Sequence, residues 1–303
     1  MSLRFNSGFI IWIRLEINIL SFLPIISSGL NIELENSVKY FLIQSWASII
    51  FLMSFFFSSY FFNSLNLLLM LRMFIKLGIS PFHTWFVSIL KTCSLYILML
   101  LSSLQKIIPL MILNNIYFHM GLFYFCFIMT IVFLFLILAR VININKLLAL
   151  SSLGNILWLI SRNLLSLKLI ILFILIYTVL LAGIYLFYSS FYYNLFRQIN
   201  RINFYDKIVI VILFISLGGM PPLLGFLRKF FILKIIFIYE NLFLFILVIF
   251  LSLILLYHYM SRMYFFITFM PLLKMNFNKG GLNLSKFIYL VSIILFNGMF
   301  FVL

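Results

Sequence analysis

The sequence predicts an all-α integral membrane protein, a polytopic helical bundle. Of its 303 residues, 66% are hydrophobic and only 9% are charged. A soluble domain has about 45–50% apolar and about 25% charged residues. Uncharged runs such as 116–139, 170–187 and 241–257 meet the length needed to cross a bilayer, roughly 20 residues. A transmembrane β-barrel would need short alternating segments, and that pattern is absent.

Apolar stretches between polar breaks predict about ten transmembrane helices. In chain order the spans are 9–28, 38–62, 64–79, 93–113, 116–138, 144–161, 165–189, 205–238, 241–268 and 285–303. The first holds Glu16 among apolar residues, and the third ends where Gly78 and Pro81 follow. The connections are short, so we expect residues 1–303 to form a single membrane domain without a soluble domain.

Two of these spans are interrupted in a similar way. Span 93–113 carries Lys106 followed by Pro109, and span 205–238 carries Gly-Gly-Met-Pro-Pro at 218–222 before Lys229. Proline breaks the hydrogen-bond ladder of a helix, and 34 helical residues would extend about 50 Å, too far for one straight crossing. A pair of interrupted helices is typical of inverted-repeat transporters and marks their ion path. The sequence therefore predicts inverted repeats with two broken helices.

Four ionisable residues within the predicted spans are candidates for a proton or cation path: Glu16, Lys76, Lys106 and Lys229. A charge at the centre of a membrane helix costs about 2.5–3.5 kcal/mol on insertion scales, so it needs a partner or a role. Arg14 is two positions from Glu16 and lies on nearly the opposite helical face, so it is not the expected partner. The alternative for any lysine is that it reaches the membrane interface, and Lys76, near a helix end, is the most open to this reading.

Composition argues against several other kinds of site. The 21 Lys and Arg against 5 Asp and Glu are dispersed singly or in pairs, which indicates membrane interfaces and no nucleic-acid partner. Cys93 and Cys126 are far apart, so neither a disulfide framework nor a metal site follows. His83, His119 and His258 are isolated, without the clustered ligands that zinc or haem requires.

Six motifs occur in the same order as in a known family. They are Trp12–Asn18, Glu35–Gln44, Lys76–Trp85, Leu104–Pro109, Asn145–Ser152 and Ser216–Phe226. The Lys-x-Gly-x-x-Pro-Phe-His and Gly-Gly-x-Pro-Pro patterns within them are the most specific. On these motifs, the chain from about residue 9 to 265 resembles the antiporter-like membrane subunits of mitochondrial NADH–ubiquinone oxidoreductase (complex I), in particular the subunit 2 family.

The resemblance implies an antiporter-like fold, a multi-pass location in the mitochondrial inner membrane, and a role for each candidate residue. Glu16 stands where the family has a glutamate that pairs with a lysine at the position of Lys76. Lys106 stands at the central lysine of the first broken helix, and Lys229 at the lysine that follows the second. His83 and Lys146 fall in family motifs near the path and are auxiliary candidates.

The resemblance also implies a function: a core subunit of complex I that contributes to proton translocation coupled to electron transfer from NADH to ubiquinone. The chain would belong to an enzyme, NADH:ubiquinone reductase, without holding a redox centre. We expect NADH, FMN, iron–sulfur clusters and ubiquinone to be handled by other subunits, and no metal or cofactor here, because no Gly-rich nucleotide loop or cluster of cysteines is present. The expected partners are the lipid bilayer and other membrane subunits, in a hetero-oligomer.

Departures from the family leave two alternatives open. Asn155 stands where the family often has a histidine, Ser88 replaces a glutamate, and the chain starts only about a dozen residues before Glu16, so the family's first helix is lost or missing. One alternative is therefore a structural scaffold subunit of the same complex with a degraded proton path. The other is a stand-alone cation–proton antiporter subunit.

Overall fold

Helices dominate the part of the chain that the structure, a computed structural model, describes. This part comprises residues 5–27, 31–56, 62–114, 119–141, 143–161, 167–189, 204–221, 223–238 and 242–268. Six stretches within it are long and apolar enough to cross a membrane. Large apolar side chains such as Trp46, Phe135 and Phe250 face outward, and soluble monomers seldom expose broad apolar surfaces. These features confirm the predicted class, a multi-pass helical membrane protein.

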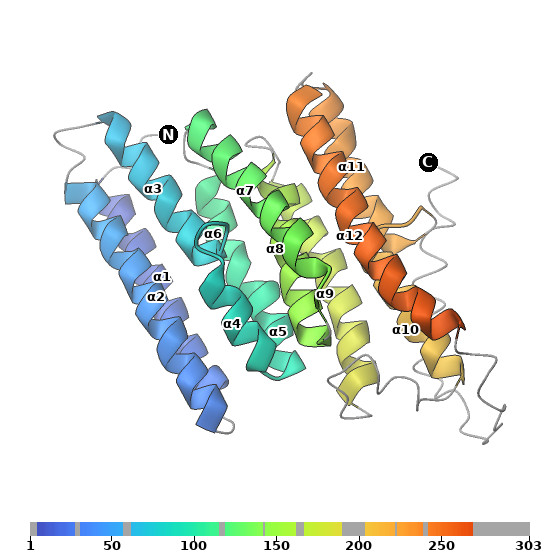
Figure 1. The fold of residues 1–303 in the computed structure, drawn as a ribbon. Coiled ribbons are helices and arrows are strands. Elements are labelled where there is room, and N and C mark those ends of the chain that lie inside the picture. Colours follow the sequence, from blue (N-terminus) through green and yellow to red (C-terminus); the bar gives the residue numbers. More distant parts are fainter. Residues whose placement is uncertain are drawn as a thin grey trace. The chain divides into compact units, whose positions relative to one another are not determined.

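The chain divides into two compact units. The first is formed by residues 1–137 and 145–168, and the second by residues 138–144 and 169–303. The helices of the first unit are α1 (Phe5–Ser27), α2 (Asn31–Phe56), α3 (Phe62–Leu77), α4 (Thr84–Thr92), α5 (Leu95–Ser102), α6 (Leu104–Leu113), α7 (Met120–Leu138) and α8 (Ile144–Ile160). Helix α2 packs between α1 and α3, and α3 packs against α6 (Figure 1).

Helix α2 begins at Asn31, seven residues before the predicted start at 38. The difference is due to three charged residues, Glu33, Glu35 and Lys39. They are too polar to be counted in a membrane span, but they favour the start of a helix. Glu33 lies in the first turn, where a negative charge interacts well with the helix dipole. Glu35 and Lys39 form an i,i+4 ion pair of 2.5 Å on the helix surface. The start of the helix is thus stabilised by charges, and the apolar pattern does not reveal it.

Helix α8 lies inside the first unit, with residues 147–161 all buried. A helix that is apolar all round its circumference buries every face, and this one carries Ser151, Ser152 and Asn155 into the interior. The serine hydroxyls donate to carbonyls three residues earlier in the same helix. Local bonds of this kind let polar side chains lie in a dry interior.

The second unit contains α9 (Leu167–Ser189), α10 (Phe204–Gly218), α11 (Leu224–Ile238) and α12 (Leu242–Thr268), with α10, α11 and α12 in mutual contact (Figure 1). Arg262 of α12 donates to the carbonyls of Leu138 and Ala139, at 3.3 and 2.8 Å. Basic side chains commonly satisfy the free carbonyls at a helix C-terminus. The predicted helix at 285–303 lies outside the described residues.

The two spans predicted to be interrupted each contain a pair of shorter helices. Helix α5 ends at Ser102 and α6 begins at Leu104; Ser103 between them has φ −120° and ψ −74°. Pro109 lies inside α6, so the interruption precedes the proline by six residues. Helix α10 ends at Gly218, Gly219 has a φ of 85°, and α11 begins at Leu224. A glycine with positive φ directly after the last helical residue is a common helix end.

Candidate functional site

Lys76 lies at the C-terminal end of α3, where the chain turns sharply into α4. Gly78, two residues on, has a φ of 72°, and a Cβ atom there would lie 2.9 Å from the Phe86 Cβ. The indole of Trp85 donates to the carbonyl of Ile75 at 3.1 Å and so fastens α4 to the end of α3. Glycine is needed because a larger residue would be strained and would press on Phe86. The turn therefore sets Lys76 and the two aromatic rings side by side.

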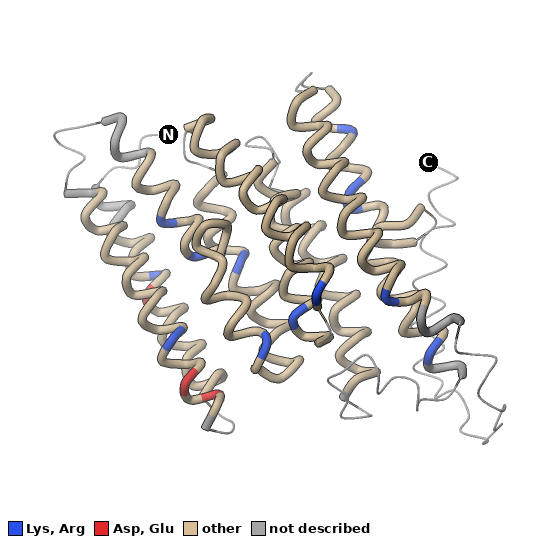
Figure 2. Tube along the Cα trace, viewed as in Figure 1, with Lys and Arg blue, Asp and Glu red and all other residues tan. Residues whose placement is uncertain are grey.

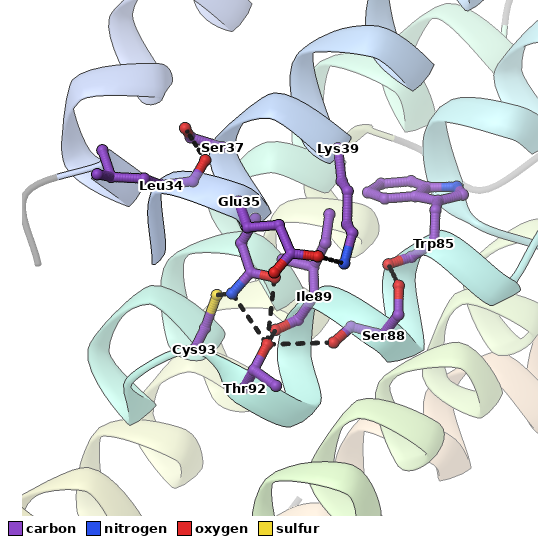
Figure 3. Close-up of polar contacts among 10 residues, drawn as sticks. Leu34, Glu35, Ser37, Lys39, Trp85, Ser88, Ile89, Thr92 and Cys93 are labelled. Carbon is purple, nitrogen blue, oxygen red and sulfur yellow. Dashed lines mark hydrogen bonds and ion pairs between the residues drawn. The ribbon is translucent and has the colours of Figure 1, made fainter. Parts of the chain in front are cut away.

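The short helix α4 is also tied to α2, and sequence analysis did not predict it because nine residues are too few for a membrane span. Asn36 of α2 donates to the Thr92 hydroxyl at 2.9 Å and to the Cys93 sulfur at 3.5 Å (Figure 3). The Thr92 hydroxyl also lies 3.2 Å from the Asn36 side-chain oxygen, to which it can donate. These contacts hold the C-terminal end of α4, whose Trp85 and Phe86 line the candidate cavity.

A small cavity in the first unit, lined by both polar and apolar side chains, brings two of the predicted lysines together. Its volume is about 20 Å³, room for about one water molecule. The lining residues come from α1 to α6 and are Leu15, Asn18, Ile19, Tyr40, Gln44, Lys76, Trp85, Phe86, Leu101, Gln105, Lys106 and Pro109. The cavity thus has both ammonium groups and three amide side chains in its wall, a composition suited to holding water and passing protons.

Lys106 is 5% exposed and makes two contacts. Its ammonium donates to the backbone carbonyl of Ser152 in α8 at 3.3 Å, and it lies 4.5 Å from the centre of the Phe86 ring. Each of these contacts stabilises a cation less than an ion pair with a carboxylate would. Next to it, the Gln105 side-chain oxygen accepts from Asn18 at 2.6 Å and from the Tyr40 hydroxyl at 3.4 Å. The amide network fixes the cavity wall without neutralising the lysine.

Glu16 is half-buried on α1 and does not line the cavity. Arg14, by contrast, is exposed. Arg72 lies one helical turn before Lys76, is fully buried, and has its guanidinium carbon 3.3 Å from the centre of the Phe51 ring. Sequence analysis missed Arg72, although its spacing of four from Lys76 puts both cations on one helix face.

The auxiliary candidates lie outside the cavity wall. His83 is half-buried just before α4, with its ring centre 3.4 Å from that of Phe133. Its Nδ1 atom is buried without a hydrogen-bond partner among the described residues. Lys146 is half-buried near the start of α8. The structure therefore brings Lys76 and Lys106 together at the cavity, whereas Glu16, His83 and Lys146 do not line it.

In the second unit, Lys229 caps the end of α10. Its ammonium donates to the carbonyl of Gly218 at 2.5 Å, and it is 3% exposed. The adjacent Arg228 donates to the carbonyl of Leu217 at 3.0 Å, with its guanidinium 5.1 and 5.2 Å from the Phe173 and Tyr177 ring centres. The last carbonyls of a helix carry partial negative charge, which stabilises both cations. Arg228 is a second buried cation that the site prediction missed, although it neighbours Lys229 in sequence.

Charge is distributed unevenly over the described helices. Figure 2 shows Lys and Arg on helices of both units, whereas Asp and Glu are drawn only on α1 and α2. The acids Asp206 and Glu240 of the second unit have no described side chains. Among the described residues, no group of three His, Cys, Asp or Glu side chains could hold a metal ion. Among the described residues, aromatic rings and backbone carbonyls are the neighbours of Arg72, Lys106, Arg228 and Lys229.

Comparison with known proteins shows the family. The sequence model of the family described as NADH:quinone oxidoreductase/Mrp antiporter, TM matches residues 6–255. NADH-ubiquinone oxidoreductase chain 2 of Anopheles gambiae is 31% identical over 310 residues, which cover 95% of this chain and 89% of that protein. The protein of the same name from Aedes aegypti is 32% identical, covering 91% and 83%.

Solved structures share the fold. A chain of respiratory complex I from Thermus thermophilus with bound aureothin has a TM-score of 0.75 at 16% identity, covering 95% of this chain and 71% of that chain. A chain of the membrane-bound sulfane sulfur reductase, an archaeal respiratory membrane complex, has a TM-score of 0.73 at 16% identity, covering 96% and 68%. The fold is therefore the antiporter-like membrane fold, and the chain belongs to the NADH:quinone oxidoreductase/Mrp antiporter family of membrane subunits.

Proposed function

We propose that this chain is a core membrane subunit of respiratory complex I in the mitochondrial inner membrane and contributes to its proton translocation. The relatives at 31% and 32% identity are NADH-ubiquinone oxidoreductase chain 2 proteins, matched over most of their length. The observation that carries the mechanism is the cavity lined by residues of α1 to α6, among them Lys76 and Lys106. In this role the chain forms a single membrane domain within a hetero-oligomer of membrane subunits.

The proposed proton path uses Glu16, Lys76 and Lys106 in the first unit. In this proposal a proton passes between the two lysine amines through water in the cavity, which both residues line. Glu16 is proposed as the acid of this path, because a carboxylate close to a lysine favours its charged form. The backbone carbonyl of Ser152 accepts a hydrogen bond from the Lys106 ammonium.

Lys229 is the proposed proton-carrying lysine of the second unit. In this proposal, α5–α6 and α10–α11 are the two broken helices of an inverted repeat. The interruption after α10 supports the role, since it frees the Gly218 carbonyl for the ammonium. His83 and Lys146, which lie outside the cavity wall, are proposed only as auxiliary groups. The redox chemistry and its cofactors belong to other subunits of the complex, so this chain takes part in the enzyme through proton transfer alone.

Lys106→Met tests the proposal in the assembled complex. Methionine keeps most of the side-chain length and removes the charge and the proton. We expect normal amounts of complex in native gels and a loss of proton translocation driven by NADH oxidation in sealed membrane vesicles. Lys91→Met is the matched control, because Lys91 is an exposed lysine of α4 in the same unit. Translocation equal in the two variants and the wild type would refute the proton-carrying role.

The second candidate function is a scaffold subunit with a degraded path. The observation that favours it is Asn155, which is 5% exposed in the interior helix α8 and cannot titrate. A scaffold predicts that Lys106→Met leaves translocation unchanged, while packing substitutions in α8 lower the amount of assembled complex. The same pair of measurements therefore separates the two functions.

A further inference from the structure

Arg228 and Lys229 of α11 bind the same helix end. The Arg228 guanidinium donates to the Leu217 carbonyl at 3.0 Å, and the Lys229 ammonium donates to the next carbonyl, that of Gly218, at 2.5 Å. Both side chains are buried. The backbones of α10 and α11 touch at Gly225, where a Cβ atom would lie 1.5 Å from a carbonyl oxygen of α10. Residues three and four positions after this contact lie on the same face of α11, and they are the two cations.

The charge of Arg228 is permanent and its position is fixed. A guanidinium does not lose its proton in proteins, whereas the amine of a buried lysine can. The guanidinium carbon lies 5.1 and 5.2 Å from the centres of the Phe173 and Tyr177 rings of α9, distances at which an aromatic face stabilises a cation. Of the two cations at this helix end, Lys229 is therefore the one that can change its charge.

The ionisable side chains that face this pair from neighbouring helices are phenols. Tyr177 of α9 lies beside the guanidinium, and the Tyr259 ring of α12 lies 3.4 Å from the position of a Cβ atom on Gly218. Phenols are neutral near pH 7. The other described ionisable side chains of α9 to α12 are Tyr185, Tyr188, Lys207, Lys234, Tyr257, His258, Arg262 and Tyr264. Arg228 is the cation that shares the helix end with Lys229.

We propose that Arg228 is a positioning residue that favours release of the proton from Lys229. The inference rests on the proposed role of Lys229 in proton translocation and adds a residue to it. A helix C-terminus carries about half a negative elementary charge, and both cations draw on this one end. A like charge held nearby disfavours the charged form of an ionisable group. Since Arg228 keeps its charge, the repulsion is relieved when the Lys229 ammonium gives its proton to water and becomes a neutral amine.

The test is the pH dependence of proton translocation per NADH oxidised, in sealed vesicles that hold the assembled complex. Arg228→Gln keeps an N–H donor for the Leu217 carbonyl but removes the charge, Arg228→Met removes both, and Arg228→Lys keeps a positive charge. Translocation should fall at low pH, where Lys229 stays protonated. Without the neighbouring charge Lys229 holds its proton up to a higher pH, so the half-maximal pH should rise by about one unit or more in the Gln and Met variants.

Two comparisons control for effects other than the charge beside Lys229. Arg228→Lys should keep a half-maximal pH close to that of the wild type. Arg140→Gln is the matched control, because Arg140 is an exposed arginine of the same unit, and its half-maximal pH should equal that of the wild type. A rise in Arg140→Gln as large as in Arg228→Gln would overturn the inference, since the position of the charge would then not matter.

An unchanged half-maximal pH in both charge-free variants, or failure of both to assemble, would also overturn the inference, because a purely structural arginine predicts those results. Lys106→Met and Glu16→Gln, measured in parallel, report on the proposed function separately. If these two lose translocation while Arg228→Gln keeps the wild-type pH profile, only the role of Arg228 is refuted. If Lys106→Met translocates like the wild type, the proposed function fails, and the inference that rests on it fails too.

Discussion

Replacing Gly219 with alanine should displace the Lys229 ammonium from the end of α10. Gly219 has a φ of 85°, and a Cβ atom there would lie 2.8 Å from both the Nζ and the Cδ of Lys229. The lysine side chain is flexible and would move away, because the alternative is to shift the backbone of the turn. Its hydrogen bond to the Gly218 carbonyl, 2.5 Å long, would be lost.

The size of the effect follows from two contributions. A residue other than glycine in the left-handed region costs about 1–2 kcal/mol. Loss of a hydrogen bond to a charged group costs about 1.5–3 kcal/mol more. The turn would therefore be strained by about 1–2 kcal/mol whichever rotamer Lys229 adopts, and the lost hydrogen bond would remove about 1.5–3 kcal/mol that now favours the present rotamer. Such a change acts on the ammonium and leaves the apolar packing of α10 against α12 unchanged.

The assay is proton translocation per NADH oxidised in sealed vesicles, compared with the amount of complex in native gels. We expect Gly219→Ala to assemble at a reduced level and to lose most of its translocation. Gly121→Ala is the matched control, because Gly121 lies on an exposed face of α7 and a Cβ there would meet only the His119 ring, at 3.7 Å. If the Gly219 variant translocates at the wild-type rate, the capping of α10 by Lys229 has no role in proton transfer.

Three further substitutions test the packing around the site. Arg228→Met removes the donor to the Leu217 carbonyl and should lower the free energy of unfolding by about 1.5–3 kcal/mol. The midpoint of thermal inactivation of the complex should therefore fall, and an unchanged midpoint would contradict this. Asn145→Leu leaves the Cys93 carbonyl without its 3.0 Å bond and should cost about 1–3 kcal/mol in the same measurement, a value near zero being the opposing result. Gly225→Ala should abolish assembly, because a backbone carbonyl of α10 occupies the position of the new Cβ, and a normal native-gel band would disprove that close approach.

The helical membrane class and the burial of Lys106 and Lys229 could be predicted because they depend on residue type and order. Uncharged runs identify spans, and Lys106 and Lys229 are visible beside proline and glycine. Helix α4 was hidden, since nine residues with polar positions resemble a loop. Its position depends on two hydrogen bonds. Asn36 of α2 donates to Thr92, far away in the sequence, and Trp85 donates to the Ile75 carbonyl in the preceding helix.

The partners of the buried cations could not be predicted at all. The acceptor for Lys106 is the Ser152 backbone carbonyl, and a carbonyl carries no sequence signal. Arg72 resembles any basic residue at a membrane interface until the packing of α2 and α3 places it against Phe51. The roles of Glu16, Lys76, Lys106 and Lys229 in proton transfer stay predictions that the experiments above address.

Contact between α10 and α11 at Gly225 limits how the second unit can move. With the Ser216 carbonyl pressed against Gly225, the two helices meet backbone to backbone, without side chains to slide between them. Arg228 and Lys229, on the next turn of α11, bind the carbonyls that follow in α10. The pair therefore behaves as one stiff body. If Lys229 transfers protons, the movement must come from changes of its side-chain rotamer and of nearby water. Helices α10 and α11 would keep their positions relative to each other.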